Sequence, residues 1–332
     1  MLEAYTASIL NSGSWILTPE QLQFVLIFKG DNIALVVDYF TSSENVSIRY
    51  GTWTCDSKIK KGSVILLGGR KEFMEKHEET IAELNQRSFD VYSLDWRGQG
   101  LSTRTLSDRH KGFVNDFKDY TNDLDYFVHN VVRPGAVSPL IILAHSMGGH
   151  IALHFMHDHP QLVDKAVLTS PMIDINVPYI PGWMVRSISR LAVKNGLGHV
   201  YSIGSKGYSA SKNKFEGNRL TSDPVRFMDE HRAIESNPDL ALGGVTYGWL
   251  AAAFDSIDLL LSKGYAEKIL SPVFIISAGR DKIVSETAQK AICSRMDKCR
   301  FFSISESYHE ILKERDNARN IFWREFDGFI NG

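Results

Sequence analysis

The chain has 332 residues, of which 43% are hydrophobic and 23% are charged. This balance is typical of a globular protein and excludes a disordered chain. With 37 basic and 39 acidic residues the formal net charge is −2, so no overall basic field attracts nucleic acid and no such partner is expected.

The beginning of the chain matches no pattern, and residues 1–34 are assigned to an N-terminal extension of unknown role. They lack a basic region and carry Glu3, so a secretory signal is not expected. The apolar stretch 22–40 is too interrupted by charged residues to span a membrane. Two edge strands are expected there instead.

Strands and helices alternate along the rest of the chain, after a hairpin expected over residues 35–54. The expected strands are 63–67, 89–94, 139–144, 164–169, 272–277 and 300–304. The expected helices are 72–86, 114–131, 147–158, 286–296 and 317–330. This alternation predicts an α/β fold with a mainly parallel central sheet flanked by helices.

Residues 171–262 interrupt the alternation, because they have helical apolar spacing and no long buried strand. We interpret them as a helical cap inserted between two parts of one core, residues 35–170 and 263–332. The apolar side chains of the cap either line a tunnel for an acyl chain or only pack the cap onto the core. The candidates for substrate contact are Trp183, Met184, Trp249, Leu250 and Phe254.

The cap also contains a run with seven basic residues and one acid, Glu216. The basic residues are Arg186, Arg190, Lys194, Lys206, Lys212, Lys214 and Arg219. Such a run is either a solvated face or a surface that touches anionic lipid head groups transiently.

The run SPLIILAHSMGGH, residues 138–150, predicts a strand, a sharp turn and a helix. The turn places Ser146 where backbone N–H groups and the positive end of the helix face a developing oxyanion. A strained turn requires small residues two positions away on each side, and Ala144 and Gly148 meet that requirement. Ser146 is the candidate nucleophile, and the alternative is a serine that only caps the helix.

A serine nucleophile requires a base and an orienting acid, in the chain order serine, acid, histidine. Asp281 and His309 each follow a predicted strand, at the edge where a parallel sheet presents its active site. Three other acids are poorly placed, since they precede the strand or adjoin the histidine: Asp255, Asp258 and Glu310. We therefore expect Asp281 to be the acid and His309 the base.

An oxyanion needs two N–H donors. The N–H of Met147, directly after Ser146, is the first. The turn Gly68-Gly69-Arg70 follows the strand 63–67, and its glycines allow the backbone to approach a substrate closely. We assign the second donor to the N–H of Arg70.

The histidines of one expected helix and the cysteines of the chain bear on two further questions, metal binding and the redox state of the compartment. His150, His154 and His157 share one helix face, but the H-E-x-x-H pattern is absent, so we interpret them as packing or surface histidines and expect no metal. The three cysteines, Cys55, Cys293 and Cys299, are few and odd in number. Such a set indicates a reducing, cytoplasmic compartment. A bridge between Cys293 and Cys299 is sterically conceivable but is not expected.

Seven runs in the sequence resemble the bacterial lysophospholipase and monoacylglycerol lipase-like branch of the α/β-hydrolase superfamily. In chain order they read GGRKEFMEKHEETIAEL, DVYSLDWRGQGLSTR, KGFVNDFKDYTNDL, LAHSMGGH, LTSPMIDI, SAGRDKIV and YHEILKERD. The resemblance implies an α/β-hydrolase fold with Ser146, Asp281 and His309 as the triad, and no cofactor. It also implies a lipid-like ester substrate for a cytoplasmic enzyme that is peripheral at the membrane. Two alternatives remain open, namely an aminopeptidase-like enzyme that cleaves amides and a non-catalytic homologue that only binds a ligand.

Overall fold

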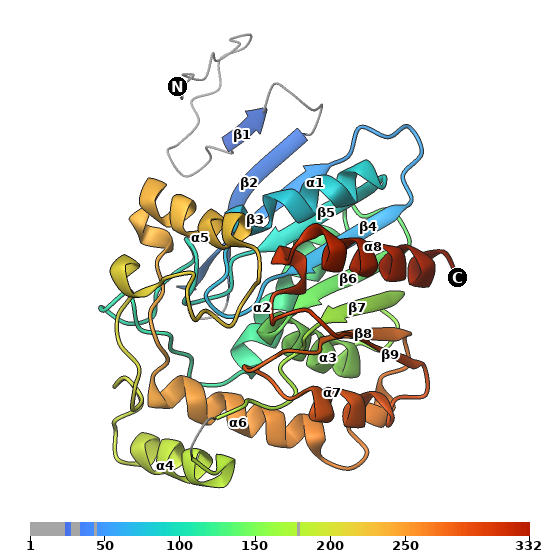
Figure 1. Ribbon diagram of the computed structural model, residues 1–332. Helices are drawn as coiled ribbons and strands as arrows, with labels where there is room; N and C mark the ends of the chain where they lie inside the picture. Colours follow the sequence, from blue (N-terminus) through green and yellow to red (C-terminus); the bar gives the residue numbers. More distant parts are fainter. Residues whose placement is uncertain (1–23, 28–33, 43–44, 178–179) are drawn as a thin grey trace.

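The structure of the protein, a computed structural model, describes residues 24–27, 34–42, 45–177 and 180–332 (Figure 1). Its strands join in one nine-stranded sheet in the order β1-β2-β3-β5-β4-β6-β7-β8-β9. The strands are β1 (Phe24–Ile27), β2 (Ala34–Thr41), β3 (Ser47–Thr54), β4 (Gly62–Leu67), β5 (Phe89–Leu94), β6 (Leu140–His145), β7 (Lys165–Thr169), β8 (Val273–Ala278) and β9 (Cys299–Ile304). β1, β2, β3 and β5 pair antiparallel, and every pair from β5 to β9 is parallel.

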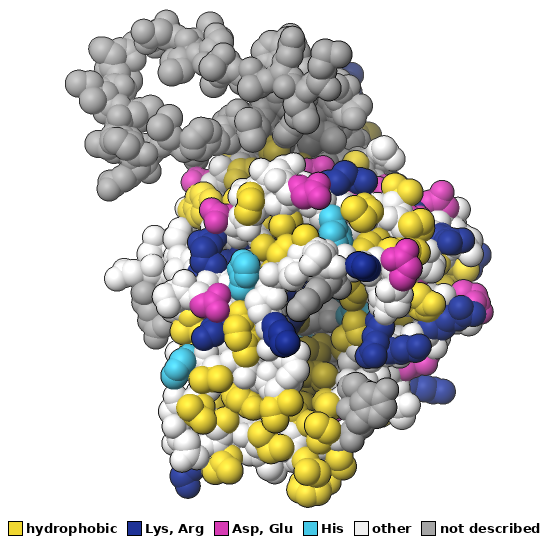
Figure 2. Space-filling view, turned by 60° about the vertical axis from the view of Figure 1, so that its left-hand side comes forward, with side chains coloured by type: hydrophobic (Ala, Val, Ile, Leu, Met, Phe, Trp, Pro, Cys, Tyr) yellow, Lys and Arg dark blue, Asp and Glu magenta, His cyan; other side chains and the backbone are white. Residues whose placement is uncertain are grey.

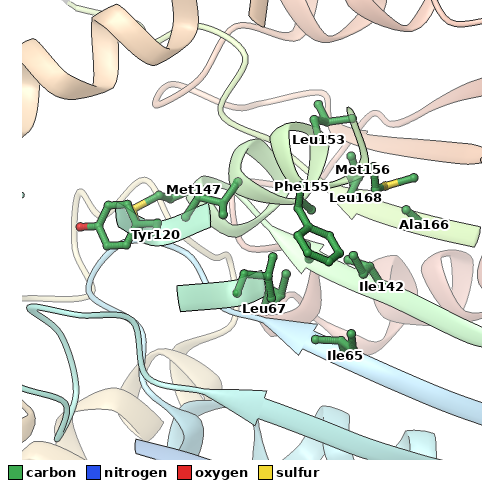
Figure 3. Packing of buried hydrophobic residues seen from close by; sticks show 14 of the residues in the cluster. Ile65, Leu67, Tyr120, Ile142, Met147, Leu153, Phe155, Met156, Ala166 and Leu168 are labelled. Carbon is green, nitrogen blue, oxygen red and sulfur yellow. The ribbon is translucent and has the colours of Figure 1, made fainter. Parts of the chain in front are cut away.

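Helices cover both faces of the sheet, which explains why β4, β5, β6 and β8 are buried at every residue. α1 (Glu78–Gln86) and α8 (Asp316–Asn331) pack on one face. α2 (Lys118–Phe127), α3 (Met147–Asp158) and α7 (Glu286–Cys293) pack on the other (Figure 1). Figure 3 shows Phe155 of α3 pointing toward Ile142 of β6, with Met147 beside Tyr120. The helix that follows Ser146 is thereby fixed against the sheet.

Three helices lie between β7 and β8, at one end of the sheet (Figure 1). They are α4 (Gly182–Lys194), α5 (Pro224–Ser236) and α6 (Tyr247–Leu261). Asp223 caps α5 by accepting the N–H groups of Val225 and Arg226. α6 buries its apolar residues in the same core cluster as the sheet, whereas α4 buries only Ser189. α6 is therefore part of the core packing, and α4 is a surface helix.

Six short helical segments complete the fold among the described residues. Five are 3-10 turns, and one, η4, is a π-helical turn. Their bounds are η3 (Met74–His77), η4 (Val128–Val132), η5 (Ala210–Lys212), η6 (Pro238–Leu240), η7 (Ala266–Lys268) and η8 (Ile311–Lys313).

Every expected strand and helix of the core is present, although several bounds are shifted, and the helices expected over 72–86 and 114–131 each include a short 3-10 or π segment. The hairpin and the two edge strands are present as β1 to β3, although residues 1–23, 28–33 and 43–44 lie outside the described part of the chain. The helix expected over 114–131 begins at Lys118, because Asp116 Oδ1 accepts the Lys118 N–H at 2.9 Å and starts the helix there. No helix within the described ranges is long and apolar enough to cross a membrane.

Cys293 and Cys299 form a disulfide, the bridge that the sequence analysis considered sterically conceivable but did not expect. α7 ends at Cys293 and β9 begins at Cys299, and two successive turns between them bring the Cα atoms to 5.3 Å. That separation lies within the usual range for a bridge. Cys55 is the one free thiol and is buried. The inference of a reducing compartment rested on the small and odd number of cysteines, and the disulfide argues against it, because such bridges are rare in reducing compartments.

Candidate active site

Ser146 lies in the sharp turn between β6 and α3, with φ 51° and ψ −114°. This left-handed conformation is strained for a residue with a side chain. Three backbone hydrogen bonds hold it: Ser146 N–H donates to Thr169 O, and Ser146 O accepts from His150 and Met172. A Cβ at Gly148 would lie 2.6 Å from the carbonyl oxygens of Leu67 and Gly68, so only glycine fits there.

His309 lies between Ser146 and Asp281 in a continuous chain of hydrogen bonds. Its Nε2 is 3.0 Å from Ser146 Oγ, and its Nδ1 is 2.7 Å from Asp281 Oδ2. A carboxylate can only accept, so this contact places the proton on Nδ1 and leaves Nε2 to accept from the serine hydroxyl. The other oxygen of Asp281 accepts the N–H groups of Ile283 and Val284.

The environment of Asp281 keeps its carboxylate charged. Burial by itself raises the pKa of Asp281, but the hydrogen bond and charge of His309 and the two backbone N–H groups outweigh it and leave the pKa lowered. The three competing acids are occupied elsewhere. Glu310 binds Lys76, and Asp255 and Asp258 bind Arg190.

The loop after β4 passes directly beside the nucleophile. A Cβ at Gly69 would lie 3.2 Å from Ser146 Cβ, and the Gly69 N–H is taken by the carboxylate of Glu72. The Arg70 N–H has no hydrogen-bond partner among the described residues. The N–H of Met147 begins α3 and lacks an acceptor within the helix. Both N–H groups are thus available to a substrate oxygen.

The Arg70 side chain ties this loop to the cap. Its Nη2 donates to Gly243 O, and its guanidinium lies 5.5 Å from the ring centroid of Trp249. Burial lowers the pKa of Arg70 to about 10.

A cavity of about 370 Å³ is lined by Ser146 and His309 together with apolar and polar residues. The apolar lining residues, named here the apolar wall, are Met172, Ile175, Leu220, Val245, Trp249, Leu250, Ile283 and Val284. The polar lining residues, named here the polar wall, are Arg70, Lys71, Glu72, Lys76, Asn213, Glu230 and Glu310. The cavity at the candidate nucleophile thus offers contacts to both an apolar chain and a polar group of one substrate.

Of the five cap residues predicted to touch substrate, the structure brings two, Trp249 and Leu250, to this cavity. Trp183 projects from α4 and is 68% exposed. Met184 is on the same helix and is not among the residues that line the cavity. Phe254 is fully buried beneath the Arg186 guanidinium, 4.5 Å from it. No residue of α4 lines the cavity. The apolar spacing of the sequence is similar in both helices, so it could not show that α6 lines the cavity and α4 does not.

The polar wall holds a buried charge cluster that the sequence analysis missed. Lys76 Nζ lies 3.1 Å from Glu72, 3.2 Å from Glu230 and 2.7 Å from Glu310. Burial alone lowers the pKa of Lys76, but the three carboxylates reverse this and raise it well above its usual value. The spacing of Glu72 and Lys76, four residues apart in the segment that the sequence predicted as helix, was a readable signal, although the helical turn itself begins at Met74. Glu230 comes from the cap, and nothing in the sequence connects it to Lys76.

The same lysine acts differently on its three partners. Burial raises the pKa of each carboxyl, and the Lys76 charge reverses this at Glu72 and Glu230, whose pKa values are lowered. At Glu310 burial and the neighbouring carboxylates prevail, and the pKa is raised.

The histidines on α3 are engaged in packing. His150 Nε2 and His154 Nε2 both contact the hydroxyl of Ser256 on α6, at 2.7 and 3.0 Å. Burial lowers the pKa of both imidazoles, that of His154 to about 4. His157 contacts its neighbour Asp158. In the part of the chain that the structure describes, no group of three or more metal-binding side chains comes together.

The basic run of the cap is partly neutralised by acids outside it. Arg186 pairs with Asp174 and Asp258, and Arg190 pairs with Asp255 and Asp258. The net positive charge of this surface is thus smaller than the sequence suggested.

A mainly parallel sheet between two helical layers, with a serine on the strand–helix turn and an aspartate and a histidine after later strands, defines an α/β hydrolase. Residues 58–316 match the family described as serine aminopeptidase, S33 (Hydrolase_4). Lysophospholipase L2 of Escherichia coli strain K12 is 31% identical over 304 residues, which cover 88% of this chain and 86% of the relative. Probable lysophospholipase L2 of Haemophilus influenzae is 28% identical over 295 residues, which cover 88% and 91%.

Among solved structures, a soluble variant of monoglyceride lipase from Saccharomyces cerevisiae in complex with a substrate analogue superposes with a TM-score of 0.71 at 19% identity, covering 88% of this chain and 94% of that one. The chain belongs to the serine aminopeptidase S33 family, in the branch of lysophospholipases and monoacylglycerol lipases, and is a serine hydrolase.

Proposed function

We propose that the protein hydrolyses the carboxylic ester of a lipid-like monoester, a lysophospholipid or a monoacylglycerol. Ser146 is the nucleophile, His309 the base and Asp281 the orienting acid. The observation that carries the proposal is that Ser146 lines one cavity together with the eight residues of the apolar wall and the seven of the polar wall. The apolar wall receives the acyl chain, and the polar wall receives the alcohol part of the ester. The names of the lysophospholipase relatives support the same substrate class.

The reaction proceeds through an acyl-enzyme in two steps. His309 Nε2 takes the proton of Ser146 as Oγ attacks the ester carbonyl, and the resulting oxyanion accepts the N–H groups of Met147 and Arg70. His309 then gives the proton to the leaving alcohol. In the second step His309 removes a proton from water as the water oxygen attacks the acyl-serine carbonyl. His309 then returns this proton to Ser146 Oγ as the bond to the acyl carbon breaks, which releases the fatty acid and restores the enzyme. Asp281 stabilises the imidazolium in both steps, and water is the only other reactant.

The chain divides by role in this proposal. Residues 35–170 and 263–332 form the hydrolase core, residues 171–262 form the cap, and residues 1–34 form an extension. The core supplies the reacting groups, and the cap supplies Glu230, Trp249 and Leu250 to the cavity walls.

The exposed side of α4 supports a transient contact with a lipid surface. Trp183 is 68% exposed and Leu191 is 62% exposed on this helix, and Ile188 and Val193 add to the apolar surface. Figure 2 shows hydrophobic side chains gathered over the lower part of the face that carries α4. Contiguous exposed apolar surface of this kind favours interaction sites. Flotation of the protein with neutral vesicles tests the contact, and Trp183→Ser with Leu191→Ser is expected to reduce the bound fraction.

One observation favours a second candidate, the cleavage of an amide beside a free amino group. The carboxylates of Glu230 and Glu310 line the cavity and would attract the ammonium of a peptide amino terminus. The eight apolar residues that line the same cavity favour the ester of a fatty acid over a peptide.

A substrate panel combined with active-site labelling tests the proposal. The panel comprises p-nitrophenyl esters, monoacylglycerols, lysophospholipids and aminoacyl anilides. A fluorophosphonate probe is expected to label the wild type, whereas Ser146→Ala should lose labelling and at least about a thousandfold in turnover. Ser170→Ala is a matched control, because Ser170 is also buried at positive φ and its hydroxyl has no partner among the described residues.

Three results would refute the proposal. They are activity that persists in Ser146→Ala, equal losses in both variants, and cleavage confined to anilides.

A further inference from the structure

The buried side chain of Gln99, in the loop after β5, binds the backbone on both sides of Arg70. Its Nε2 donates to Gly69 O at 3.0 Å, and its Oε1 accepts the Lys71 N–H at 3.2 Å. Only this orientation of the amide gives both backbone groups a partner, because Nε2 can only donate and Oε1 can only accept. One side chain thus holds the two peptide groups that flank the Cα atom of Arg70.

The contact with Gly69 O determines where the Arg70 N–H points. Among the described residues the only cis peptide bond precedes Pro139, so the bond between Gly69 and Arg70 is trans. The carbonyl and the N–H of a trans peptide point in opposite directions. Apart from Gln99, Gly69 O accepts only the N–H of Glu72, at 3.4 Å, within the described part of the chain. Gln99 therefore directs the Arg70 N–H away from itself, and that N–H stays free for a substrate oxygen.

The backbone at Lys71 is strained, and Gln99 helps to hold it. Lys71 has φ 70°, in the left-handed region that is unfavourable for a residue with a side chain. Such a conformation persists only where surrounding contacts enforce it. The hydrogen bond from the Lys71 N–H to Gln99 is one of these contacts, and Trp96 Nε1 adds another by donating to Gly68 O at 2.8 Å. The loop after β5 thus shapes the loop that carries Arg70.

The loop that carries Gln99 is itself fixed in place. It contains the run DWRGQG, which the proposed reaction leaves without a role. Asp95 at the start of this run accepts the Leu101 N–H at 2.9 Å. A Cβ at Gly100 would collide with the Asp95 carboxylate, so the chain turns tightly directly after Gln99. The amide of Gln99 is therefore presented to Arg70 from a rigid support.

We propose that Gln99 is a positioning residue that aims the N–H of Arg70 at the oxyanion. Arg70 lines the cavity at Ser146, whereas Gln99 is not among its described lining residues, so Gln99 acts on the substrate only through Arg70. The assignment rests on the proposed ester hydrolysis and on Arg70 as the second oxyanion donor. Because the oxyanion exists only after Ser146 has attacked, the loss of Gln99 should affect the transition state and not the bound ester.

The first test is Gln99→Met, which keeps the length of the side chain and removes both hydrogen bonds. Hydrolysis of p-nitrophenyl butyrate is measured per intact site, counted by the end point of fluorophosphonate labelling. We expect kcat to fall by about tenfold to a hundredfold, part of the effect of removing an oxyanion donor, with KM within about threefold of the wild type. The acid limb of the pH profile of kcat/KM should stay in place, because the contact of His309 with Asp281 is untouched.

A trifluoromethyl ketone gives a readout that depends on the oxyanion itself. Ser146 Oγ adds to the ketone carbon, the hydroxyl proton passes to His309, and the ketone oxygen becomes the negatively charged oxygen of a hemiketal. In Gln99→Met the inhibition constant should rise by the same factor as kcat/KM falls. A merely structural loss of intact sites would leave the inhibition constant unchanged.

Gln99→Glu separates the two contacts of the amide. A carboxylate at this position can still accept the Lys71 N–H, but it cannot donate to Gly69 O. This variant should lose kcat as Gln99→Met does, because the Gly69 contact is the one that directs the Arg70 N–H.

Asn85→Leu is a matched control that removes a buried amide far from the reaction. Asn85 Nδ2 donates to the carbonyls of Trp53 and Phe89, and Phe89 begins β5 at the end of the strand opposite to the Gln99 loop. The variant should lower the stability, measured by urea titration, and keep kcat per labelled site within about threefold of the wild type.

Several results would overturn the assignment. Wild-type kcat per labelled site in either Gln99 variant would do so, as would a loss that appears in KM or leaves the inhibition constant of the ketone unchanged. If neither Gln99 variant gave protein that can be labelled, Gln99 would serve folding and the assignment would be wrong as well. Failure of the proposed function has a different signature, namely a wild type that hydrolyses no ester or a Ser146→Ala variant that keeps its activity.

Discussion

His309 Nδ1 and Asp281 Oδ2 are 2.7 Å apart, although the two residues are separated by 28 positions in the sequence. Glu310, the next residue after His309, turns its carboxylate away from the imidazole and onto Lys76. The parallel order of β8 and β9 produces this arrangement, since the loops after adjacent parallel strands emerge at the same edge of the sheet. Glu310, which adjoins His309 in the sequence, thus binds Lys76, whereas Asp281, 28 positions away, binds the imidazole.

Asp281→Asn is expected to lower kcat by about four orders of magnitude with little change in KM, because the amide favours the wrong tautomer of His309. Steady-state kinetics on a soluble ester measures both parameters. The control is Glu306→Gln, which breaks the surface ion pair with Arg280 that links the same two loops. That variant should stay within about threefold of the wild type, as exposed pairs contribute little. Equal losses of kcat in the two variants would show that Asp281 only positions the loop and does not orient His309.

The core of the fold could be predicted because its signals are local. Buried strands such as β4 (Gly62–Leu67) and the helix that begins at Met147 carry their periodicity in the sequence. The loops with Asp281 and His309 follow from strand order alone. The disulfide joins residues only six positions apart, and that spacing permits a bridge without deciding that it forms. Two features could not be predicted, because they depend on packing between distant segments: the position of α4 outside the cavity and the contact of Glu230 with Lys76. The last is separated by 154 positions and has no local pattern.

Gly148→Ala is expected to destabilise the protein and to impair turnover. The added Cβ would lie 2.6 Å from two carbonyl oxygens of the β4 strand end and its loop, so backbone must move at the nucleophile turn. We expect a loss of about 1–3 kcal/mol in the free energy of unfolding, measured by urea titration. Gly328→Ala is the matched control on α8, where a Cβ meets nothing within 4 Å. It should stabilise the helix by up to about 1 kcal/mol. Similar changes in the free energy of unfolding for both variants would contradict the claim that the turn at Gly148 has no room for a Cβ atom.

The buried His154 predicts how stability falls in acid. Burial depresses its folded pKa to about 4, below the value of about 6.5 in an unfolded chain. The stabilising contribution is therefore complete above pH 6.5 and is lost as the pH falls toward 4, at up to about 1.4 kcal/mol per pH unit. His154→Gln should reduce this slope between pH 6 and 4.5 in denaturant titrations. Tyr265→Phe removes only the hydroxyl partner of the imidazole, 2.7 Å away, and should keep most of the slope. Parallel curves for the wild type and His154→Gln would exclude this histidine as the source.

Leu250 provides the test of the apolar wall. Its side chain lines the cavity, and each methylene that a substrate buries there contributes about 0.8 kcal/mol, which is roughly fourfold in kcat/KM. The preference of the wild type for p-nitrophenyl esters should therefore rise from acetate toward decanoate until the wall is filled. Leu250→Arg places a cation in that wall and should flatten the profile, with a much larger loss on decanoate than on acetate. Leu259→Arg, on the same helix but half exposed and outside this cavity, should retain the profile of the wild type. A flat profile in the wild type, or equal loss across all chain lengths in Leu250→Arg, would place the acyl chain elsewhere. The triad chemistry would remain testable independently, since Ser146, His309 and Asp281 all come from the core.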